Sequence, residues 1–399
     1  MGDGPLRVAI FSDSALPILN GVSVSIDLLV RGLRNQGHSV HIFTAAHFRY
    51  RDPDPNTYRF HAVETPWTKK YPLAFPPFYG MLRKFRRHEF DIIHSHTPWT
   101  IGFVGLRWAE SHDIPIVSTY HTLYDRYAHY IPFFPRRYLR FKIAKHTSFY
   151  YNSVDHVLTP SEASKRWLLR HSVESPITVI PTGAPDRQML ERSEMRHKLQ
   201  IPPEHKILLY VGRIALEKNL GILLEASAKV MRKDPSVRLW LVGDGPYRQA
   251  CIEQARALGI GDRVTFAGFV PRHDVDQYYA AADLFVFSSV TETQGLVVQE
   301  AMTYGLPTVA LAGGGASDSI IDDVNGYAIR GDAAALADAI QYVLNNEPIY
   351  ARLSQGAQKT VRQYTASGMT ERVVDVYRQV LQQGADRSRR RVPVASQKA

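Results

Sequence analysis

The sequence predicts an α/β fold that contains two doubly wound domains in tandem. Short, nearly continuous apolar runs alternate with amphipathic stretches at helical spacing. Strands buried on both faces, with helices that cover them, produce this alternation. The alternation stops at the polar, charged residues 184–205 and then starts again. Each series therefore predicts its own parallel sheet, built from βαβ units.

The first series contains the strand candidates of the first domain. They are LRVAIFS (6–12), SVHIFTA (39–45), FDIIHSH (90–96), PIVSTYH (115–121), HVLTPS (156–161) and ITVIPTG (177–183). A helix is expected from Val22 to Gln36, because Gly37 directly after it is typical of a helix C-terminus. Helical patterns lie between most of the other candidates, so these strands are expected to be parallel.

The second series contains the strand candidates of the second domain. They are KILLYVG (206–212), VRLWLVG (237–243), RVTFAGF (263–269), LFVFSS (284–289) and PTVAL (307–311). Each ends at a turn rich in glycine, serine or proline, and helices are expected from about Leu220, Pro246, Asp274 and Gly295. After Pro348 a long helical pattern runs to about Gln383. In doubly wound sheets, ligands bind at the carboxyl ends of the strands.

Length and pattern also predict the domain bounds. The chain has 399 residues, enough for two or three domains with cores of their own. We expect a first domain over 1–184, a linker over 185–205, a second domain over 206–368 and a basic, disordered tail over 385–399.

Composition excludes several classes of protein. The chain has one cysteine, Cys251, which excludes a disulfide framework or a thiolate metal cluster and fits a reducing compartment. No apolar run approaches the roughly 18 residues of a spanning helix, and the N-terminus leads into a strand instead of a signal peptide. We therefore expect a soluble or peripheral protein.

Charge is distributed unevenly between the two halves. The formal net charge is +10, and residues 1–184 hold 22 basic and 14 acidic residues while residues 185–399 hold 26 and 24. The basic excess therefore predicts an anionic partner that only the first domain touches.

The segment GRIALEK, from Gly212 to Lys218, follows a strand candidate directly. Gly212 would let the backbone approach a ligand, and Arg213 and Lys218 would bring two cations that suit a diphosphate. The alternative is a solvated charged turn in which Glu217 pairs with a neighbour. Neither a Walker loop nor a GxGxxG after a strand occurs, so a dinucleotide oxidoreductase loses its main support.

The segment TETQGLVVQEAM (291–302) holds two carboxylates, Glu292 and Glu300, with seven residues between them. Gly295 precedes a helical pattern, so backbone N–H groups near 294–297 would be available for phosphate or sugar oxygens. Glu292 could accept hydrogen bonds from sugar hydroxyls, and Glu300 from both ribose hydroxyls. The alternative is that both acids are surface charges.

Two segments of the first domain are further candidates. Asn20-Gly21, after the first strand, predicts a turn with positive φ and a phosphate-ready helix start, although a plain βα turn explains it equally well. His121 ends a strand candidate beside several tyrosines, where α/β folds place reacting groups. His94 and His96 end another strand, but no third ligand at useful spacing supports a metal site.

Two basic-aromatic stretches lie in the first domain. Residues 67–90 and 125–146 each carry six Lys or Arg and one acid, with Phe, Tyr and Trp between them. This composition is typical of a segment that lies at an anionic membrane surface. A nucleic-acid surface and solvated helix faces are the alternatives.

Taken together, these residues resemble the retaining, nucleotide-sugar-dependent glycosyltransferases of the GT-B fold, in group 1 and family 4. The shared features, in chain order, are the N-terminal glycine loop, the Gly-Arg…Glu-Lys segment (212–218), the spaced acids (292 and 300) and GLPTVA (305–310). The resemblance implies two Rossmann-like domains facing across a cleft. It also implies a last helix, about 369–384, that crosses back to the first domain.

The resemblance further implies the role of each site residue. Arg213 and Lys218 would bind the donor diphosphate and stabilise its charge as it leaves. Glu292, with the amides around Gln294, Gly295 and Leu296, would bind the donor sugar, while Glu300 would bind the ribose. Gly21 would let the first domain approach the diphosphate, His121 would touch the sugar, and Val270 would lie at the nucleobase. No metal or other cofactor is expected, and the anomeric configuration would be retained.

One departure from the family pattern concerns the substrate. Most members have an apolar aromatic residue where this chain has Gln294. TETQGL (291–296), TYHTLYDRYAHY (119–130) and the basic-aromatic stretches are similar to the subgroup that transfers glucose from UDP-glucose to diacylglycerol. This similarity implies a peripheral enzyme on the cytoplasmic face of the membrane, with a lipid acceptor and no nucleic-acid partner. A phosphatidylinositol or soluble sugar acceptor, a UDP-sugar epimerase and a nucleic-acid-binding protein are the alternatives.

Overall fold

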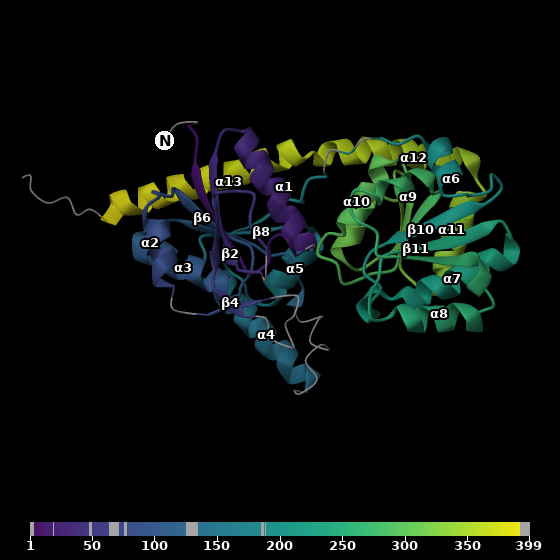
Figure 1. Cartoon of the computed structure of the whole chain (residues 1–399), viewed down its shortest axis with the longest axis horizontal. Helices are drawn as coiled ribbons and strands as arrows, with labels where there is room; N and C mark the ends of the chain where they lie inside the picture. The colour runs from purple at the N-terminus through teal and green to yellow at the C-terminus, as the bar shows by residue number, and fades with distance from the viewer. Residues whose placement is uncertain are drawn as a thin grey trace, which may run out of the picture. The chain divides into compact units, whose positions relative to one another are not determined.

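The structure is a computed structural model that describes residues 4–18, 20–47, 50–63, 72–75, 78–124, 135–184, 187 and 189–391. The chain folds as two compact units (Figure 1). Unit 1 contains residues 1–183 and 366–399, and unit 2 contains residues 184–365.

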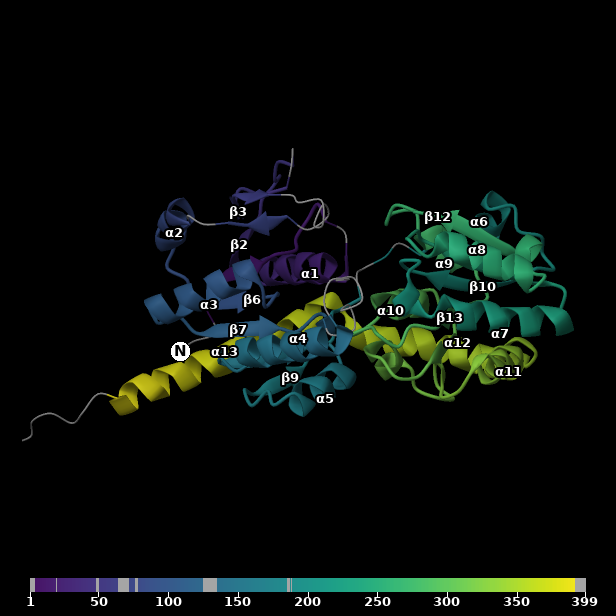
Figure 2. The same cartoon turned by 90° about the horizontal axis from the view of Figure 1, so that it is seen from below.

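Unit 1 is built on a seven-stranded sheet of parallel strands in the order β3-β2-β1-β6-β7-β8-β9. Its strands are β1 (Arg7–Ser12), β2 (Ser39–Ala45), β3 (Thr57–Phe60), β6 (Ile92–Ser95), β7 (Ile116–Thr119), β8 (His156–Thr159) and β9 (Ile177–Val179), with a small antiparallel pair, β4 (Ala62–Val63) and β5 (Leu73–Ala74). Its helices are α1 (Gly21–Asn35), α2 (Tyr79–Arg86), α3 (Thr100–His112), α4 (Arg136–Tyr151), α5 (Glu162–Arg170) and α13 (Ala366–Arg391) (Figure 2).

Aromatic residues fill the core of unit 1 on one face of the sheet. Phe11 of β1 stacks on Phe43 of β2 with 4.8 Å between ring centroids, and the edge of Trp108 from α3 meets Phe11 at 5.6 Å. A Cβ on Gly105 would lie 2.9 Å from the Phe11 ring, so glycine lets α3 pack closely on β1. Because large rings bury much apolar area, this cluster is a major source of the unit's stability.

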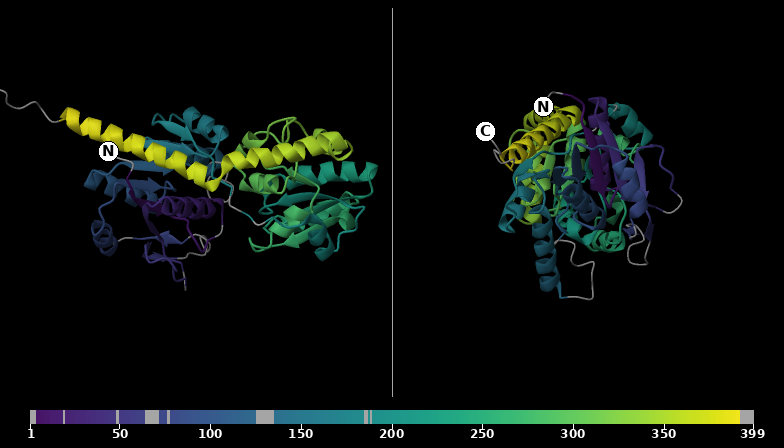
Figure 3. Two further views of the ribbon diagram at one scale, coloured as in Figure 1. Left: turned by 90° about the horizontal axis from the view of Figure 1, so that it is seen from above. Right: turned by 90° about the vertical axis from the view of Figure 1, so that its left-hand side faces the viewer.

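The C-terminal helix α13 packs within unit 1 (Figure 3). It crosses α1 at Gly32, where a Cβ would lie only 2.1 Å from Oγ1 of Thr370. Its Tyr377 is fully buried and shares a 2.6 Å hydrogen bond with Nδ1 of His94 in β6. Close helix packing and one buried polar contact thus tie the end of the chain to the sheet.

Unit 2 is built on a six-stranded sheet of parallel strands in the order β12-β11-β10-β13-β14-β15. Its strands are β10 (Lys206–Val211), β11 (Val237–Val242), β12 (Val264–Gly268), β13 (Leu284–Phe287), β14 (Thr308–Leu311) and β15 (Gly326–Ile329). Its helices are α6 (Arg192–Lys198), α7 (Leu220–Lys233), α8 (Arg248–Ala257), α9 (Asp276–Ala281), α10 (Leu296–Thr303), α11 (Ala333–Leu344) and α12 (Glu347–Val361). The strand order reverses between β10 and β13, which is where doubly wound sheets bind ligands.

The structure confirms each strand candidate of both series, with ends that differ by a few residues. The sequence did not predict the edge strands β3 and β15 or the small antiparallel pair β4 and β5. Three of the four residues of β3 and of β15 are only half-buried, so these strands lack the continuous apolar run of a strand buried on both faces.

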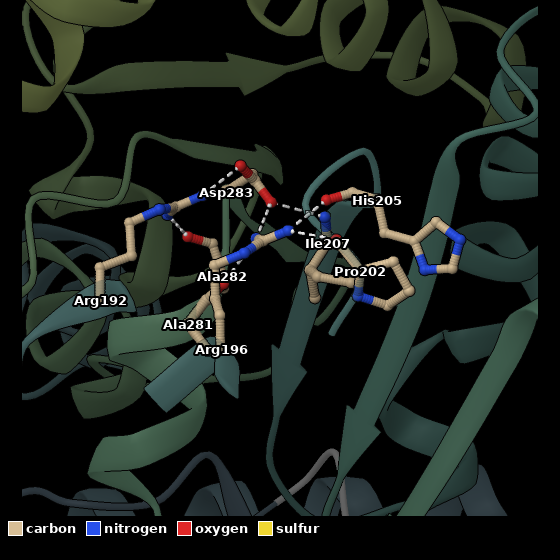
Figure 4. Close-up of polar contacts among 8 residues, drawn as sticks. All are labelled: Arg192, Arg196, Pro202, His205, Ile207, Ala281, Ala282 and Asp283. Carbon is tan, nitrogen blue, oxygen red and sulfur yellow. Dashed lines mark hydrogen bonds and ion pairs between the residues drawn. The ribbon is translucent and has the colours of Figure 1, made fainter. Parts of the chain in front are cut away.

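The linker expected over 185–205 is only partly correct. Residues 192–198 form helix α6, and Met195 and Ile201 are buried in the core of unit 2. Arginines of α6 also bind the end of α9: Arg196 donates to the carbonyl of Ala281 at 3.1 Å, and Arg192 lies 2.6 Å from the Asp283 carboxylate (Figure 4). The carboxylate of Asp283 in turn accepts from the backbone N–H of Ile207 at the start of β10, as Figure 4 also shows. Charged residues that suggested a solvated linker instead satisfy a helix C-terminus.

Two other expectations about the C-terminal region are corrected. The long helical pattern after Pro348 forms α12, a short turn of 3₁₀ helix (Arg362–Tyr364) and α13, because Thr365 is extended where the chain leaves unit 2. Helix α13 continues to Arg391, so 385–391 are helical and not disordered, and residues 392–399 lie outside the described part. Basic residues at a helix C-terminus are favourable with the helix dipole.

Candidate active site

The donor-binding candidates of unit 2 gather at the carboxyl ends of two neighbouring strands. Arg213 and Lys218 follow β10, and Glu292 and Glu300 follow β13. Because β10 and β13 pair at the point where strand order reverses, their following loops emerge side by side. The topology therefore brings together residues that are far apart in sequence.

Lys218 and Glu292 form a close ion pair. Nζ of Lys218 lies 2.5 Å from Oε1 of Glu292. Lys218 ends a short 3₁₀ helix (Leu216–Lys218) and is only 7% exposed. The hydroxyl of Ser288, just after β13, donates a 2.8 Å hydrogen bond to the carbonyl of Lys218. This bond holds the backbone of Lys218 at the end of the neighbouring strand. The sequence predicted both residues but not their pairing.

Arg213 pairs with Glu217 in the same loop. This is the contact that the alternative interpretation of the segment proposed. The Glu217 side chain is buried, while that of Arg213 remains 47% exposed. Because a guanidinium has five N–H donors, Arg213 can hold Glu217 and still offer donors to an anion.

Close packing within unit 2 accounts for the glycine at position 212. Gly212 has φ of 152°, and a Cβ there would lie 2.9 Å from the hydroxyl of Tyr210. A Cβ on Gly243, at the end of β11, would lie 2.0 Å from the carbonyl oxygen of Gly212. Close approach of the two strand ends thus requires these glycines, whether or not a ligand also approaches Gly212.

The loop before α10 is held by its backbone. Gly295 precedes the helix with φ of 75°, and a Cβ there would lie 2.6 Å from that of Ala316. The backbone N–H of Gly315 donates to the carbonyl of Glu292 at 2.7 Å. The first N–H groups of α10, which starts at Leu296, are therefore presented from a fixed loop as donors for sugar or phosphate oxygens.

Gln294 is buried at this helix start. Its Nε2 donates to Oε1 of Gln299 at 3.1 Å, and both side chains are nearly inaccessible. The residue that departs from the family pattern thus belongs to a buried polar pair. Its partner Gln299 was not predicted.

Glu300 lies on α10 within a network that the sequence did not predict. Its Oε1 is 2.7 Å from Nη2 of Arg187, and its Oε2 accepts from the hydroxyl of Tyr279 at 2.9 Å. Arg272 lies 3.7 Å from the same Oε1. Arg187 stood in the expected linker and carried no motif, so no sequence signal pointed to it.

Val270 follows β12 and is half-buried against the core of unit 2. The neighbouring Phe269 has an exposed ring. The contact of position 270 with a nucleobase would involve the backbone, and it stays a prediction.

In unit 1, His121 follows β7 and belongs to a buried histidine cluster. Nε2 of His121 lies 2.8 Å from Nδ1 of His96, whose ring lies 4.1 Å from that of His94. Burial lowers the pKa of His121 and of His94 to about 3, and it lowers that of His96 well below its ordinary value. The three imidazoles are therefore neutral near pH 7.

The hydrogen bonds of the cluster favour one tautomer of His121. Nε2 of His96 is buried and lacks a hydrogen-bond partner among the described residues. A proton there would be an unpaired buried donor, so the proton is better placed on Nδ1, from which it is donated to His121. His121 then carries its own proton on Nδ1, which makes that atom a donor.

Gly21 occupies the first position of α1, but not as expected. Asn20 caps the helix with φ of −151° and accepts from the N–H of Ser23, whose hydroxyl is bonded to Asn20 in return. Gly21 is not among the glycines with positive φ, so the predicted positive-φ turn is wrong. The capping box makes such a turn unnecessary.

The basic-aromatic stretches are partly described. Residues 64–71, 76–77 and 125–134 lie outside the described part. Within it, the first turns of α4 project from the body of unit 1 (Figures 1 and 3). Exposed side chains on α2, on the residue that follows it and on α4 are Tyr79, Arg83, Lys84, Arg86, Arg87, Arg137, Tyr138, Arg140, Phe141, Lys142, Lys145 and Phe149.

The described residues contain neither a membrane-spanning helix nor a metal-binding cluster of side chains. No helix there is both long and apolar enough to cross a bilayer. In the same part of the chain, no group of three or more His, Cys, Asp or Glu side chains is arranged to hold a metal ion.

Comparison with known proteins identifies the family. The family profile described as glycosyl transferases group 1 matches residues 191–360, and that described as glycosyltransferase family 4 matches residues 19–188. An alpha-monoglucosyldiacylglycerol synthase of Streptococcus pneumoniae is 34% identical over an alignment of 352 positions that covers 84% of this chain and 78% of the relative. The chain belongs to this glycosyltransferase family.

Other relatives of the glycosyltransferase differ in their named substrates. A D-inositol 3-phosphate glycosyltransferase of Corynebacterium diphtheriae is 28% identical over 407 residues, covering 93% of this chain and 94% of the relative. The solved structure of Anabaena Alr3699/HepE in complex with UDP-glucose has a TM-score of 0.73 and 21% identity, and the match covers 93% of this chain and 99% of that one. This likeness, with the two doubly wound units, establishes the GT-B fold of the glycosyltransferase.

Proposed function

We propose that this glycosyltransferase transfers glucose from UDP-glucose to diacylglycerol at an anionic membrane surface, with retention of the anomeric configuration. The observation that carries the proposal is the 34% identity, over 84% of the chain, to a protein named alpha-monoglucosyldiacylglycerol synthase. A structural neighbour solved with UDP-glucose supports the donor. The exposed basic and aromatic side chains of α2 and α4 support a lipid acceptor.

The donor would bind to unit 2 through charges and backbone amides. Lys218 and Arg213 would bind the diphosphate, and the first N–H groups of α10 would bind sugar or phosphate oxygens. Glu292 would accept hydrogen bonds from sugar hydroxyls, and Glu300 would accept them from the ribose. Val270 would lie at the base through its backbone, and His121 is proposed to touch the donor sugar.

The chemical step follows from this assignment. The bond between the anomeric carbon and the β-phosphate oxygen breaks, and UDP leaves with the electron pair. The acceptor hydroxyl forms the new bond on the same face and gives its proton to the leaving phosphate. Lys218 and Arg213 stabilise the negative charge that develops on the diphosphate, which is the main electrostatic need of the reaction. The route uses no metal and no protein nucleophile.

The acceptor side of the proposal rests on unit 1. Tyr138, Phe141 and Phe149 are exposed on α4 among basic residues. Rings at headgroup depth and basic side chains near anionic lipid together give reversible binding. We therefore propose a peripheral enzyme on the inner face of the cytoplasmic membrane.

A soluble inositol phosphate is the second candidate acceptor, since relatives with that named substrate match over nearly the whole chain. Exposed rings on α4 favour the lipid, because a small polar acceptor gains nothing from them.

The test is a product assay. The protein is incubated with UDP- and GDP-sugars and either a lipid extract or inositol phosphates, and the product is identified by mass. Monoglucosyldiacylglycerol from UDP-glucose supports the proposal. A glycosylated inositol phosphate, interconverted UDP-sugars or no product from UDP-glucose contradicts it.

A further inference from the structure

Arg187 is a buried cation between two carboxylates of unit 2. Its Nη2 lies 2.7 Å from Oε1 of Glu300, and its Nη1 donates to Asp276 at the start of α9. The side chain is only 5% exposed. Its guanidinium also lies over the ring of Tyr279, 5.9 Å from the centroid.

Two acidic side chains contact this one buried cation. Burial of a guanidinium alone is unfavourable, but two carboxylates in contact with it offset that cost. Burial lowers the pKa of Arg187, yet the charges of Glu300 and Asp276 outweigh burial and raise it above its ordinary value. Arg187 therefore stays charged, and it holds two acids close together that would otherwise repel.

Protein donors occupy some of the hydrogen-bond acceptor sites on the Glu300 carboxylate. An ionised carboxylate offers about four lone-pair sites, two on each oxygen. Arg187 occupies one site on Oε1, and the hydroxyl of Tyr279 occupies one on Oε2. Arg272, at 3.7 Å, is too far for a hydrogen bond. Among the donors of the described residues, these leave one site on each oxygen, which matches two adjacent hydroxyl groups that donate to the two oxygens.

We propose that Arg187 is a positioning residue for donor binding. It fixes the plane of the Glu300 carboxylate from Oε1, while Tyr279 fixes it from Oε2, so that the remaining sites accept the 2′- and 3′-hydroxyls of the ribose. This inference rests on the proposed function, in which Glu300 binds the ribose. Arg187 itself need not touch the nucleotide.

The test compares binding of UDP and 2′-deoxy-UDP by calorimetry, which needs neither acceptor nor membrane. A hydrogen bond to a charged group typically gives about 10- to 100-fold in affinity, so the wild-type protein is expected to lose that much with 2′-deoxy-UDP. In Arg187→Met, UDP binds more weakly and the loss caused by the missing hydroxyl falls to about threefold or less. Arg187→Lys keeps one charge without the planar fork and is expected to lie between the two.

The control is Arg192→Met. Arg192 pairs with Asp283 in the same unit and does not contact Glu300. This variant is expected to keep the wild-type ratio of the two affinities. If Arg187→Met does not fold, Arg187→Lys decides the question in the same way.

The outcomes separate the inference from the proposed function. An unchanged ratio in both Arg187 variants, with UDP bound, overturns the positioning role and leaves the donor assignment intact. No binding of UDP by the wild-type protein, or no loss with 2′-deoxy-UDP, overturns the assignment of donor or ribose and the inference with it.

Discussion

Lys218 and Glu292 lie 74 positions apart in the chain, and their side chains meet at 2.5 Å at the carboxyl edge of the unit 2 sheet. Each neutralises the other before any ligand binds. In the proposed complex with the donor, the diphosphate would meet an ammonium that a carboxylate already orients, and a sugar hydroxyl would donate to that same carboxylate. This pairing makes the two residues interdependent.

Removal of either charge is expected to disable transfer. Lys218→Met removes the ammonium that is proposed to contact the leaving diphosphate. This variant is expected to lower kcat/KM about 100- to 1000-fold, since electrostatic stabilisation is the main catalytic term. Glu292→Gln is expected to impair transfer strongly as well. The double variant is expected to lose less than the sum of the two effects, because the residues act as a pair. Steady-state kinetics with the product assay measures all three.

Lys206→Met is the matched control. Lys206 pairs with Asp234 at 2.9 Å in the same unit, away from these loops, and its loss is expected to leave turnover near wild type. Vesicle binding is expected to be unchanged in every variant. Normal turnover of Lys218→Met would show that the site has been assigned to the wrong residues.

The histidine cluster of unit 1 predicts loss of stability in acid. The pKa of His94 and of His121 falls to about 3 in the folded protein, from an ordinary value of 6.5. The folded state thus binds fewer protons than the unfolded state between these values. Its stability is complete above about pH 6.5 and falls as the pH drops toward 3. Urea unfolding between pH 7 and pH 4 measures this slope.

Substitution of one imidazole is expected to reduce that slope. His94→Gln removes a group that must stay neutral, so its free energy of unfolding is expected to depend less on pH, although it is lower at pH 7 because the bond to Tyr377 is weakened. His273→Gln, at a highly exposed position, serves as the control with a wild-type slope. Equal slopes in all three proteins would contradict a neutral, buried cluster.

The limits of sequence-based prediction differ between the fold and the site. Apolar runs between helical patterns predicted the interior strands of both sheets, since burial on two faces leaves a continuous hydrophobic signal. Helix α6 was not predicted, because its Arg192 and Arg196 suggested a solvated linker. In the structure they bind backbone carbonyls and Asp283. Charge alone does not tell a solvated arginine from one that caps a helix.

Within the site, residues near a glycine turn were predictable and their partners were not. Lys218, Glu292 and Glu300 lie where a strand ends and a helix begins, which a sequence can indicate. Arg187 contacts Glu300 only through tertiary packing, and nothing in its local sequence specifies the contact. Gln299 is local to Gln294, but burial of the two amides against each other was not predicted.

Membrane binding is expected to depend on the basic residues of α2. Each basic side chain near an anionic surface contributes about 1 kcal/mol, so neutralising Arg83, Lys84, Arg86 and Arg87 to Gln is expected to weaken vesicle binding about 1000-fold at low salt. Binding of the wild-type protein is expected to fall as salt rises. Sedimentation with vesicles of phosphatidylglycerol measures both effects.

A control in unit 2 distinguishes the effect of where the basic residues lie from the effect of the protein's net charge. Lys198, Arg232 and Lys233 are exposed on unit 2, and their neutralisation is expected to leave vesicle binding nearly unchanged. Phe141→Ser, which removes an exposed ring of α4, is expected to weaken binding even at high salt. Absence of vesicle binding would argue for a soluble acceptor, and binding unaffected by salt and by all these substitutions would show that these residues do not hold the protein on the membrane.

The amide of Gln294 is buried against that of Gln299 at the start of α10, so its loss is expected to affect stability. Gln294→Leu leaves the Gln299 oxygen without this donor, and it is expected to lower the free energy of unfolding by about 1–3 kcal/mol. Gln294→Leu combined with Gln299→Leu removes both polar groups and is expected to recover much of that loss. If Gln294 also sets substrate choice, the double variant regains stability without regaining wild-type kcat/KM. Unfolding and kinetics of the same preparations decide this, and full recovery of both would make the pair structural alone.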